Sequence, residues 1–116
     1  MITQEQLKDV LERTEALHRY LDIDKKKVEF EEEQLRTQAP DFWDDPKRAQ
    51  EQMKKVKSIE KWIVGYKEVK TLADELQLAF DFYHDEMVTE EEVDEDYSKA
   101  IKAIEDLELK LSLIHI

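Results

Sequence analysis

Apolar side chains recur every three or four residues along most of this chain, a spacing typical of amphipathic α-helices. The longest run predicts one helix over residues 46–84, about 58 Å long at 1.5 Å per residue. Its apolar positions are Ala49, Met53, Val56, Ile59, Ile63, Tyr66, Val69, Ala73, Leu76, Phe80 and Tyr83. A second run predicts a helix over residues 90–111, with Val93, Tyr97, Ala100, Ile101, Ile104, Leu107 and Leu111 on its apolar side.

The N-terminal third of the chain carries a seven-residue repeat that weakens half-way. One position of the repeat is occupied by Leu7, Thr14, Leu21, Val28 and Leu35. Apolar residues fill the intermediate position only in the first half, because Asp24 and Glu31 stand in the equivalent places afterwards. Asp22 and Asp24 are also favourable helix N-cap residues. We therefore predict a kink or short break near Asp22, with helices over residues 4–21 and 23–38.

Helix-start signals precede three of these four helices. Two are capping boxes, in which a threonine and an acidic or amide side chain three residues later satisfy free backbone N–H groups. The third is an aspartate N-cap followed by proline at the first helical position. They are Thr3 with Gln6, Thr89 with Glu92, and Asp45 with Pro46. Residues 85–88 form a short connection, so the chain is predicted to be all-α, an elongated antiparallel helical bundle with coiled-coil character.

Composition supports this fold and narrows the partners. One glycine and two prolines are too few turn-forming residues for an all-β or α/β domain. The 30 acidic and 18 basic side chains give a net charge of -12. That charge repels phosphate backbones, so free nucleic-acid binding is not expected, whereas basic protein surfaces are favoured. The absence of cysteine and of an apolar N-terminal stretch favours a cytoplasmic, disulfide-free protein without a membrane span.

The most individual segment is the run of residues 41–46, which places Phe42, Trp43 and Asp44 just before a predicted helix. Two adjacent aromatic residues in a loop are candidates for a docking tip. The alternative is that they fold back and close the end of the bundle, because large aromatic side chains are costly to leave in water. The sequence favours the second interpretation.

Several runs resemble those of the bacterial peptide chain release factor 2 family. They are Leu11-Glu12-Arg13, Leu17-His18-Arg19-Tyr20-Leu21-Asp22, Lys26-Lys27, Pro40-Asp41-Phe42-Trp43-Asp44-Asp45-Pro46 and Arg48-Ala49-Gln50. They occur in the order and spacing found at the start of these class I release factors. The resemblance covers residues 2–110 and implies the N-terminal helical domain of such a factor. The tail, residues 111–116, departs from the family and is expected to reflect truncation or vector-derived sequence.

The resemblance implies what this chain does and what it lacks. Family members recognise UAA and UGA through a Ser-Pro-Phe tripeptide and promote peptidyl-tRNA hydrolysis through a Gly-Gly-Gln motif. A single glycine excludes the second motif, and Ser58, Ser98 and Ser112 are followed by Ile, Lys and Leu. No catalytic residue is therefore expected, and the chain is not expected to be an enzyme. The helical domain implies docking at the GTPase-associated region of the large ribosomal subunit. The expected partners are the stalk-base protein, ribosomal RNA and the class II release-factor GTPase.

Lysines concentrate in the long predicted helix, against the overall negative charge, at Lys54, Lys55, Lys57, Lys61, Lys67 and Lys70. Among them, Lys54, Lys57 and Lys61 are candidate contacts to ribosomal RNA. The alternative is that lysines here pair with acidic neighbours four residues away, such as Glu51 with Lys55. The acidic stretches, Glu29 with residues 31–33 and residues 90–96, are interpreted as solvated helix faces.

No cofactor or metal is expected, because His18, His84 and His115 are far apart and no calcium-loop pattern accompanies the carboxylates. Two other classes of function agree less well with the sequence. A generic structural coiled-coil adaptor would show a long exposed apolar seam and stable self-association. A hydrolase is opposed, because the chain has neither a glycine-rich loop nor a cysteine nucleophile, and no Ser/His/Asp grouping on loops.

Overall fold

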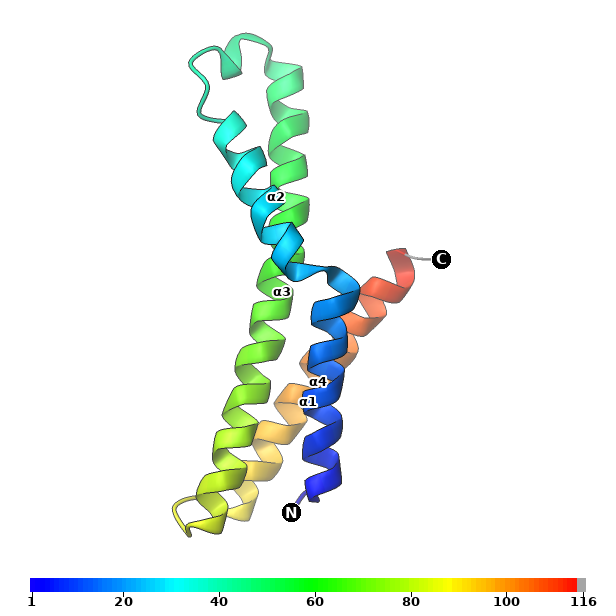
Figure 1. Cartoon of the computed structure of the whole chain (residues 1–116), viewed down its shortest axis with the longest axis vertical. Helices are drawn as coiled ribbons and strands as arrows, with labels where there is room; N and C mark the ends of the chain where they lie inside the picture. The colour runs from blue at the N-terminus through cyan, green and yellow to red at the C-terminus, as the bar shows by residue number, and fades with distance from the viewer. Residues whose placement is uncertain (115–116) are drawn as a thin grey trace. The chain divides into compact units, whose positions relative to one another are not determined.

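The computed structural model describes residues 1–114, and in that range the chain is all-α, as predicted. The elements shown in Figure 1 are α1 (Gln4–Leu21), α2 (Ile23–Arg36), the short 3-10 turn η1 (Phe42–Asp44), α3 (Pro46–His84) and α4 (Glu90–Ile114). None of the helices within this range is long and apolar enough to cross a lipid bilayer.

The chain divides into two compact units, which are described separately. Unit 1 consists of Met1–Tyr20 together with Tyr66–Ile116, and unit 2 consists of Leu21–Gly65. Helix α3 runs through both, so its first half belongs to unit 2 and its second half to unit 1.

The predicted helix boundaries are confirmed for α1 and α3 and differ by a few residues for the other two. Helix α2 ends at Arg36 rather than at residue 38, because Thr37 closes it. The Thr37 hydroxyl donates to the Gln34 carbonyl at 2.6 Å, and the Thr37 N–H donates to the same oxygen at 3.0 Å. Helix α4 continues to Ile114, so the apolar tail extends the helix at least that far.

All three predicted helix starts are formed. The Thr3 N–H donates to Gln6 Oε1 at 2.8 Å while the Gln6 N–H donates to Thr3 Oγ1 at 3.1 Å. Thr89 and Glu92 make the same reciprocal pair, with both distances 3.2 Å. At α3 the Arg48 N–H donates to Asp45 Oδ1 at 3.3 Å. Each start therefore satisfies backbone donors that lack a partner within the helix.

The predicted break between α1 and α2 lies at Asp22, whose backbone is left-handed with φ 51° and ψ 56°. The expected side-chain cap does not form, since the Asp22 carboxylate makes no capping hydrogen bond. Lys26 instead spans the break, because its N–H donates to the Asp22 carbonyl and its ammonium group donates to the Leu21 carbonyl. The break is a backbone feature supported by a lysine.

The break changes which residues of α2 are buried. Leu21 and Ile23 are both buried, although residues two apart on a continuous helix point roughly 200° away from each other. Val28 and Leu35 are in consequence 56% and 65% exposed. Positions 28 and 35 of the seven-residue repeat therefore lie outside the buried side of α2, which agrees with the weakening of the repeat after Leu21.

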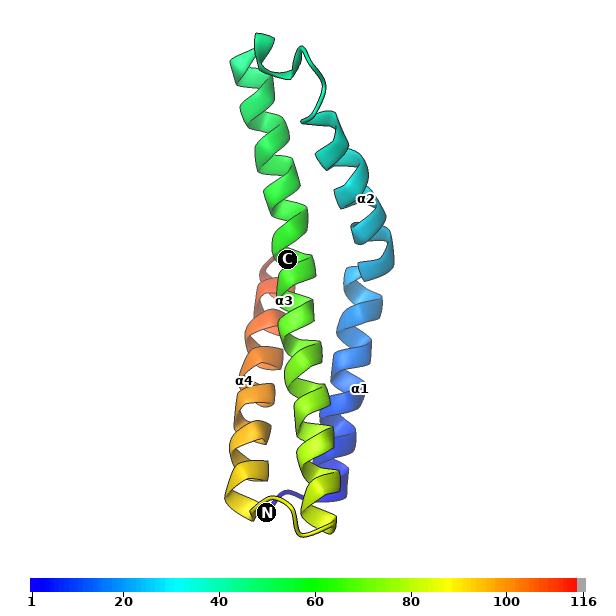
Figure 2. The ribbon, with the colours of Figure 1, turned by 90° about the vertical axis from the view of Figure 1, so that its left-hand side faces the viewer.

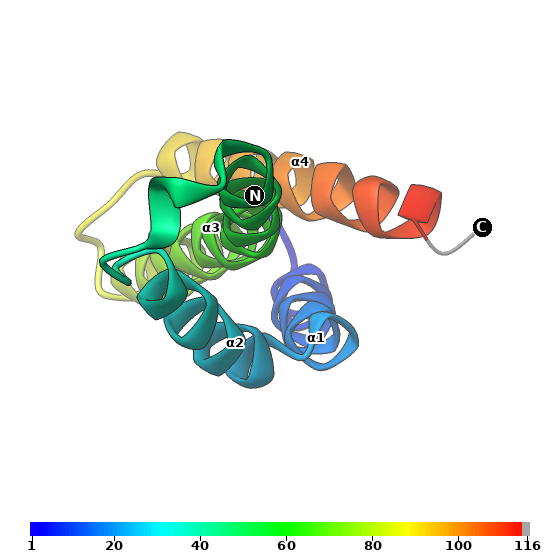
Figure 3. The ribbon, with the colours of Figure 1, turned by 90° about the horizontal axis from the view of Figure 1, so that it is seen from above.

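Unit 1 packs α1, the second half of α3 and α4 around a common core (Figure 2). Both α1 and α4 run antiparallel to α3. The buried side chains are Ile2, Leu7, Val10, Leu17, Val69, Ala73, Leu76, Ala79, Phe80, Val93, Ala100, Ile104 and Leu107. Near its end α4 diverges from α1 (Figures 1 and 3), which leaves Leu109, Leu113 and Ile114 exposed.

The turn between α3 and α4 is a Schellman motif with Glu86 where glycine is usual. Glu86 has φ 60°, its N–H donates to the Tyr83 carbonyl at 3.0 Å, and the Met87 N–H donates to the Phe82 carbonyl at 2.9 Å. Across the turn the Tyr83 hydroxyl donates to Glu90 Oε1 at 2.9 Å, and this contact raises the pKa of Tyr83. These bonds fix the short antiparallel connection that the sequence predicted.

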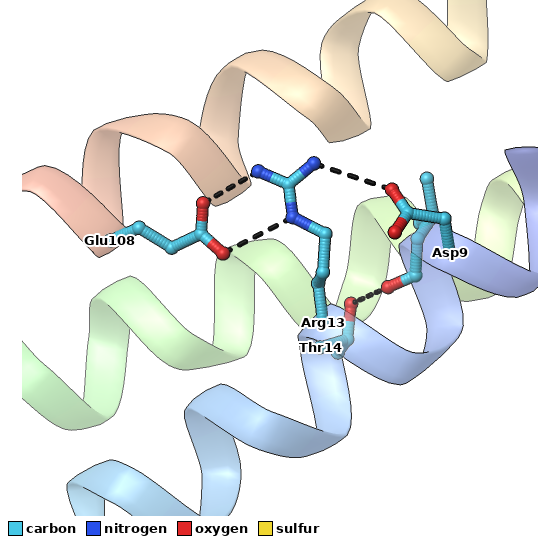
Figure 4. Close-up of polar contacts among 5 residues, drawn as sticks. Asp9, Arg13, Thr14 and Glu108 are labelled. Atoms are coloured by element: carbon cyan, nitrogen blue, oxygen red, sulfur yellow. Dashed lines mark hydrogen bonds and ion pairs between the residues drawn. The ribbon is translucent and has the colours of Figure 1, made fainter.

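Helices α1 and α4 are held in parallel register by charged contacts at two levels. Near the starts of the two helices, the N-terminal ammonium group of Met1 lies 3.1 Å from Asp94 Oδ2. Farther along both helices, Arg13 donates from Nε and Nη2 to the two carboxylate oxygens of Glu108, at 3.1 and 2.6 Å (Figure 4). Asp9 holds the remaining edge of the guanidinium group at 3.4 Å. This bidentate geometry is the strongest arrangement available to an arginine and a carboxylate.

We expect Arg13→Met to lower the free energy of unfolding by roughly 1 kcal/mol, because a charge-assisted bidentate contact is lost while most of the aliphatic packing remains. Urea unfolding of Arg13→Met, Glu108→Gln and the double variant measures the coupling, which should shrink in high salt. Lys8→Met is the control, because the Lys8–Glu12 pair is exposed and 3.8 Å apart. Equal losses for Lys8→Met and Arg13→Met would show that the contact between α1 and α4 has no special role.

Candidate functional site

The turn that joins α2 to α3 forms the tip of unit 2 (Figure 3), and the three predicted docking residues belong to this turn. The Phe42 N–H donates to the Ala39 carbonyl at 3.0 Å, and the Asp44 N–H donates to the Asp41 carbonyl at 3.1 Å. These bonds wind Phe42, Trp43 and Asp44 into the 3-10 turn η1 immediately before Asp45 caps α3. The tip is thus a compact hydrogen-bonded turn.

The two aromatic residues of the tip have different environments. Their rings meet edge to face, with centroids 5.0 Å apart and an interplanar angle of 79°. Phe42 is half-buried, whereas Trp43 is 64% exposed. The interpretation that both side chains close the end of the bundle is therefore wrong for Trp43. Phe42 supports the Trp43 ring from the protein side and leaves it facing solvent.

A surface recess of about 430 Å³ opens beside Phe42. It is lined by Arg36, Ala39, Asp41, Phe42, Asp44, Asp45, Arg48, Ala49 and Gln52. Two arginines and three aspartates give this recess groups of both signs. A protein surface with mixed charge complements such a lining better than a uniformly negative phosphate backbone does.

Directly below the tip, a buried carboxylate links α2 to α3. Glu33 is only 6% exposed. Gln52 donates from Nε2 to the Glu33 backbone carbonyl at 2.8 Å and to Glu33 Oε2 at 2.7 Å. Two cations complete the cluster, with Lys55 Nζ at 3.3 Å and Arg36 Nη1 at 3.7 Å from Glu33 Oε1. The cluster fixes the spacing between the two helices that carry the tip.

The interpretation of residues 31–33 as a solvated face holds for Glu31 and Glu32 and is wrong for Glu33. The hydrogen bond from Gln52 and the nearby Lys55 and Arg36 cations lower the pKa of Glu33. The sequence contained a pattern that could have indicated the burial of Glu33. In a helix that begins at Ile23, Ile23, Phe30 and Glu33 lie on the same side.

The predicted basic residues form a stripe on the solvent side of α3. Lys54, Lys57 and Lys61 are all exposed, on the side of the helix opposite the buried Val56 and Ile59. In the part of the chain that the structure describes, none of these three lysines has an ion-pair partner. The lysine stripe is therefore available to an external anion.

The alternative interpretation, pairing of lysines with acidic neighbours, fails for the pair that was named. The Lys55 ammonium group lies 3.3 Å from Glu33 of α2, and not beside Glu51 of its own helix. Tertiary packing therefore decides the partner of Lys55.

Charge is distributed very unevenly between the two units. By sequence, unit 2 has 11 acidic and 10 basic side chains, a net charge of -1, while unit 1 has 19 acidic and 8 basic side chains, a net charge of -11. Both the tip and the lysine stripe belong to unit 2. The strong repulsion of phosphate that the total charge predicts therefore originates almost entirely in unit 1.

The histidines show ring contacts with their neighbours. His18 meets Tyr66 edge to face at 5.2 Å, and His84 meets Phe80 in the same way at 4.9 Å. His115 lies outside the described residues. Over residues 1–114, no three potential metal ligands among His, Cys, Asp and Glu are grouped.

Comparison with known proteins identifies the family to which this arrangement belongs. Residues 23–115 match the PCRF domain family, and they include α2, the tip, α3 and α4. The chain is a member of the PCRF domain family. The PCRF domain match contains every candidate site residue named above.

Two similar curated proteins are both named peptide chain release factor 2. The protein from Aeromonas hydrophila subsp. hydrophila is 35% identical over 106 residues, and the one from Aeromonas salmonicida is 34% identical over the same length. In each case the similarity covers 90% of this chain, which spans 27% of the length of the relative. The resemblance seen in the sequence is confirmed.

We expect Glu33→Gln to destabilise this PCRF domain at neutral pH, because the substitution removes the charge that Lys55 and Arg36 face. In the folded protein the pKa of Glu33 lies below its ordinary value of 4.5. The contribution of the Glu33 charge to the free energy of unfolding is therefore complete above that pH. It is lost as the pH falls through the folded pKa. The difference between wild type and Glu33→Gln should therefore vanish in acid.

Urea unfolding of both proteins between pH 7 and pH 3 measures this difference. Glu32→Gln is the control, because Glu32 is exposed on the same helix and such a substitution changes stability by no more than about 0.5 kcal/mol. A difference for Glu33→Gln that stays constant across the pH range would contradict the ionic contribution.

Proposed function

We propose that this PCRF domain is the ribosome-docking domain of a translation termination factor. In this proposal residues 1–110 form the N-terminal helical domain, and residues 111–116 lie outside its functional part. The observation that carries the proposal is the exposed Trp43, packed against Phe42, in a chain similar to release factor 2. Phe42 in turn lines the recess of mixed charge. Exposed tryptophans supported by a rigid neighbour are typical centres of binding energy in protein interfaces.

The proposed partner is the GTPase-associated region of the large ribosomal subunit. The tip, through Phe42, Trp43 and Asp44, binds the protein at the stalk base, where its recess accommodates side chains of either charge. The lysine stripe contacts ribosomal RNA phosphates, since unit 2 is nearly neutral and does not repel them strongly. Docking at this position allows the domain to communicate with the class II release-factor GTPase.

The domain is proposed to bind without catalysing release. One glycine in the chain cannot supply Gly-Gly-Gln, and no serine is followed by proline. Codon recognition over UAA and UGA and ester hydrolysis therefore fall to other parts of the factor, which acts in the cytoplasm.

The coiled-coil adaptor is the less favoured alternative. A stable coiled coil needs an apolar seam sustained over several heptads. On α2 the large exposed apolar residues are limited to Val28 and Leu35. That length supports a local contact and not a self-associating rod.

We expect Trp43→Ala to weaken binding to purified large ribosomal subunits by about thirtyfold or more, because loss of an interface hot spot costs at least about 2 kcal/mol. Co-sedimentation of the chain with subunits, with and without the stalk-base protein, is the measurement. Tyr20→Ala is the matched control, because Tyr20 is also a large exposed aromatic residue, 74% exposed, and belongs to unit 1. Wild-type binding that does not depend on the stalk-base protein, or equal losses in both variants, would refute the docking role of the tip.

For the lysine stripe, we expect the triple variant Lys54→Gln, Lys57→Gln, Lys61→Gln to bind large subunits less tightly. The slope of log affinity against log salt should fall by about 2 to 3, because each phosphate contact contributes nearly one to that slope. The control replaces Lys67, Lys102 and Lys110, which are exposed lysines of unit 1. An unchanged salt slope in the stripe variant would show that these lysines do not contact RNA.

A further inference from the structure

The solvent side of α2 carries an apolar pair that neither the fold nor the proposed function uses. Val28 and Leu35 lie seven residues apart, two helical turns, on the side opposite the buried Ile23 and Glu33. Both are more than half exposed. Apolar residues at this spacing are the anchor pattern of helix-to-helix docking.

The groups between this apolar pair are acidic. Glu31 and Glu32 are exposed between the turns of Val28 and Leu35. Neither carboxylate has an ion-pair partner within residues 1–114. Lys25 and Lys27 lie toward the start of the helix, so the negative charge is concentrated between the two apolar residues. This acidic character disfavours a second copy of the same face, because like charges would meet.

A recess beside Leu35 defines the chemistry of the partner further. It has a volume of about 250 Å³ and is lined by Glu31, Gln34, Leu35 and Gln38. One carboxylate, two amides and an aliphatic wall match an arginine side chain, whose apolar stem packs on leucine while its guanidinium group binds carboxylate and amide oxygens. Lysine offers a single point charge and fits this fork of acceptors less well.

We propose that the outer face of α2 is a docking surface for a basic amphipathic helix of a partner protein, with an arginine of that helix in the recess beside Leu35. This inference goes beyond the proposed function, because it involves neither the tip nor the lysine stripe. The partner places apolar side chains seven residues apart against Val28 and Leu35. Its arginine pairs with Glu31, and a second cation meets Glu32.

The test uses the whole chain and a synthetic helical peptide with leucines seven residues apart and arginines between them. Amide NMR titration locates the binding site, which matters because unit 1 carries a net charge of -11 and could attract any basic peptide. The expected result is a set of shifts centred on residues 28–38. Shifts centred on the acidic start of α4, residues 90–96, would overturn the proposal.

Matched variants distinguish peptide binding at this site from non-specific electrostatic attraction of the basic peptide. Leu35→Gln should weaken peptide binding about tenfold, whereas Leu78→Gln, at a leucine 52% exposed in unit 1, should not. Glu31→Gln should weaken binding about fivefold at low salt, whereas Glu60→Gln, an exposed glutamate of α3, should not. A peptide with glutamine in place of arginine should lose the dependence on Glu31.

Equal losses for the test and control variants would overturn the inference, as would self-association of the chain through α2 measured by sedimentation. The outcome is independent of ribosome docking. Trp43→Ala is expected to leave peptide binding unchanged, so failure of one proposal can be distinguished from failure of the other.

Discussion

Asp22 holds a left-handed backbone between two helices that the side-chain repeat would otherwise join. Such a conformation costs a residue other than glycine roughly 1–2 kcal/mol. Lys26 offsets part of that cost by donating to the carbonyls of Asp22 and Leu21, so the end of α1 and the start of α2 keep their hydrogen bonds. The consequence is that the sides of α2 are rotated relative to the side-chain repeat of α1. This rotation buries Ile23 and Glu33 against α3 and turns Val28 and Leu35 outward, and the interior of unit 2 and its surfaces follow from it.

Partly buried charge then fixes the register in each unit. In unit 1 the bidentate contact of Arg13 with Glu108 aligns α1 with α4, at a level where apolar packing alone would permit sliding. In unit 2 Glu33 contacts Gln52 and Lys55 of α3 and Arg36 of its own helix. A carboxylate left without these partners in such a position would be costly, so the cluster admits few alternative alignments. The geometry of the tip depends on this cluster, because Arg36 and Gln52 also line the recess beside Phe42.

The candidate functional surfaces lie on the unit with little net charge. A strongly negative body in unit 1 gives solubility and repels phosphate, whereas unit 2 has nearly equal numbers of acidic and basic groups arranged in separate stripes. Three kinds of surface result: an exposed tryptophan beside a recess-lining phenylalanine, a row of exposed lysines on α3, and an acidic-apolar face on α2. The chain that carries these surfaces is a member of the PCRF domain family and is similar to proteins named peptide chain release factor 2.

The sequence by itself determined the helices and their starts, because capping pairs and apolar spacing act within a few residues. Thr3 with Gln6 and Thr89 with Glu92 formed as predicted, and the family resemblance was carried by local runs such as that around Phe42 and Trp43. Burial could be decided only by the tertiary structure, since it depends on which side of a helix meets another. Glu33 was expected in solvent and is buried, Lys55 was expected to pair with Glu51 and meets Glu33, and Trp43 was expected to plug the bundle and is exposed. All three lie in unit 2, where one left-handed residue rotated α2 and local patterns no longer indicated which residues face each other.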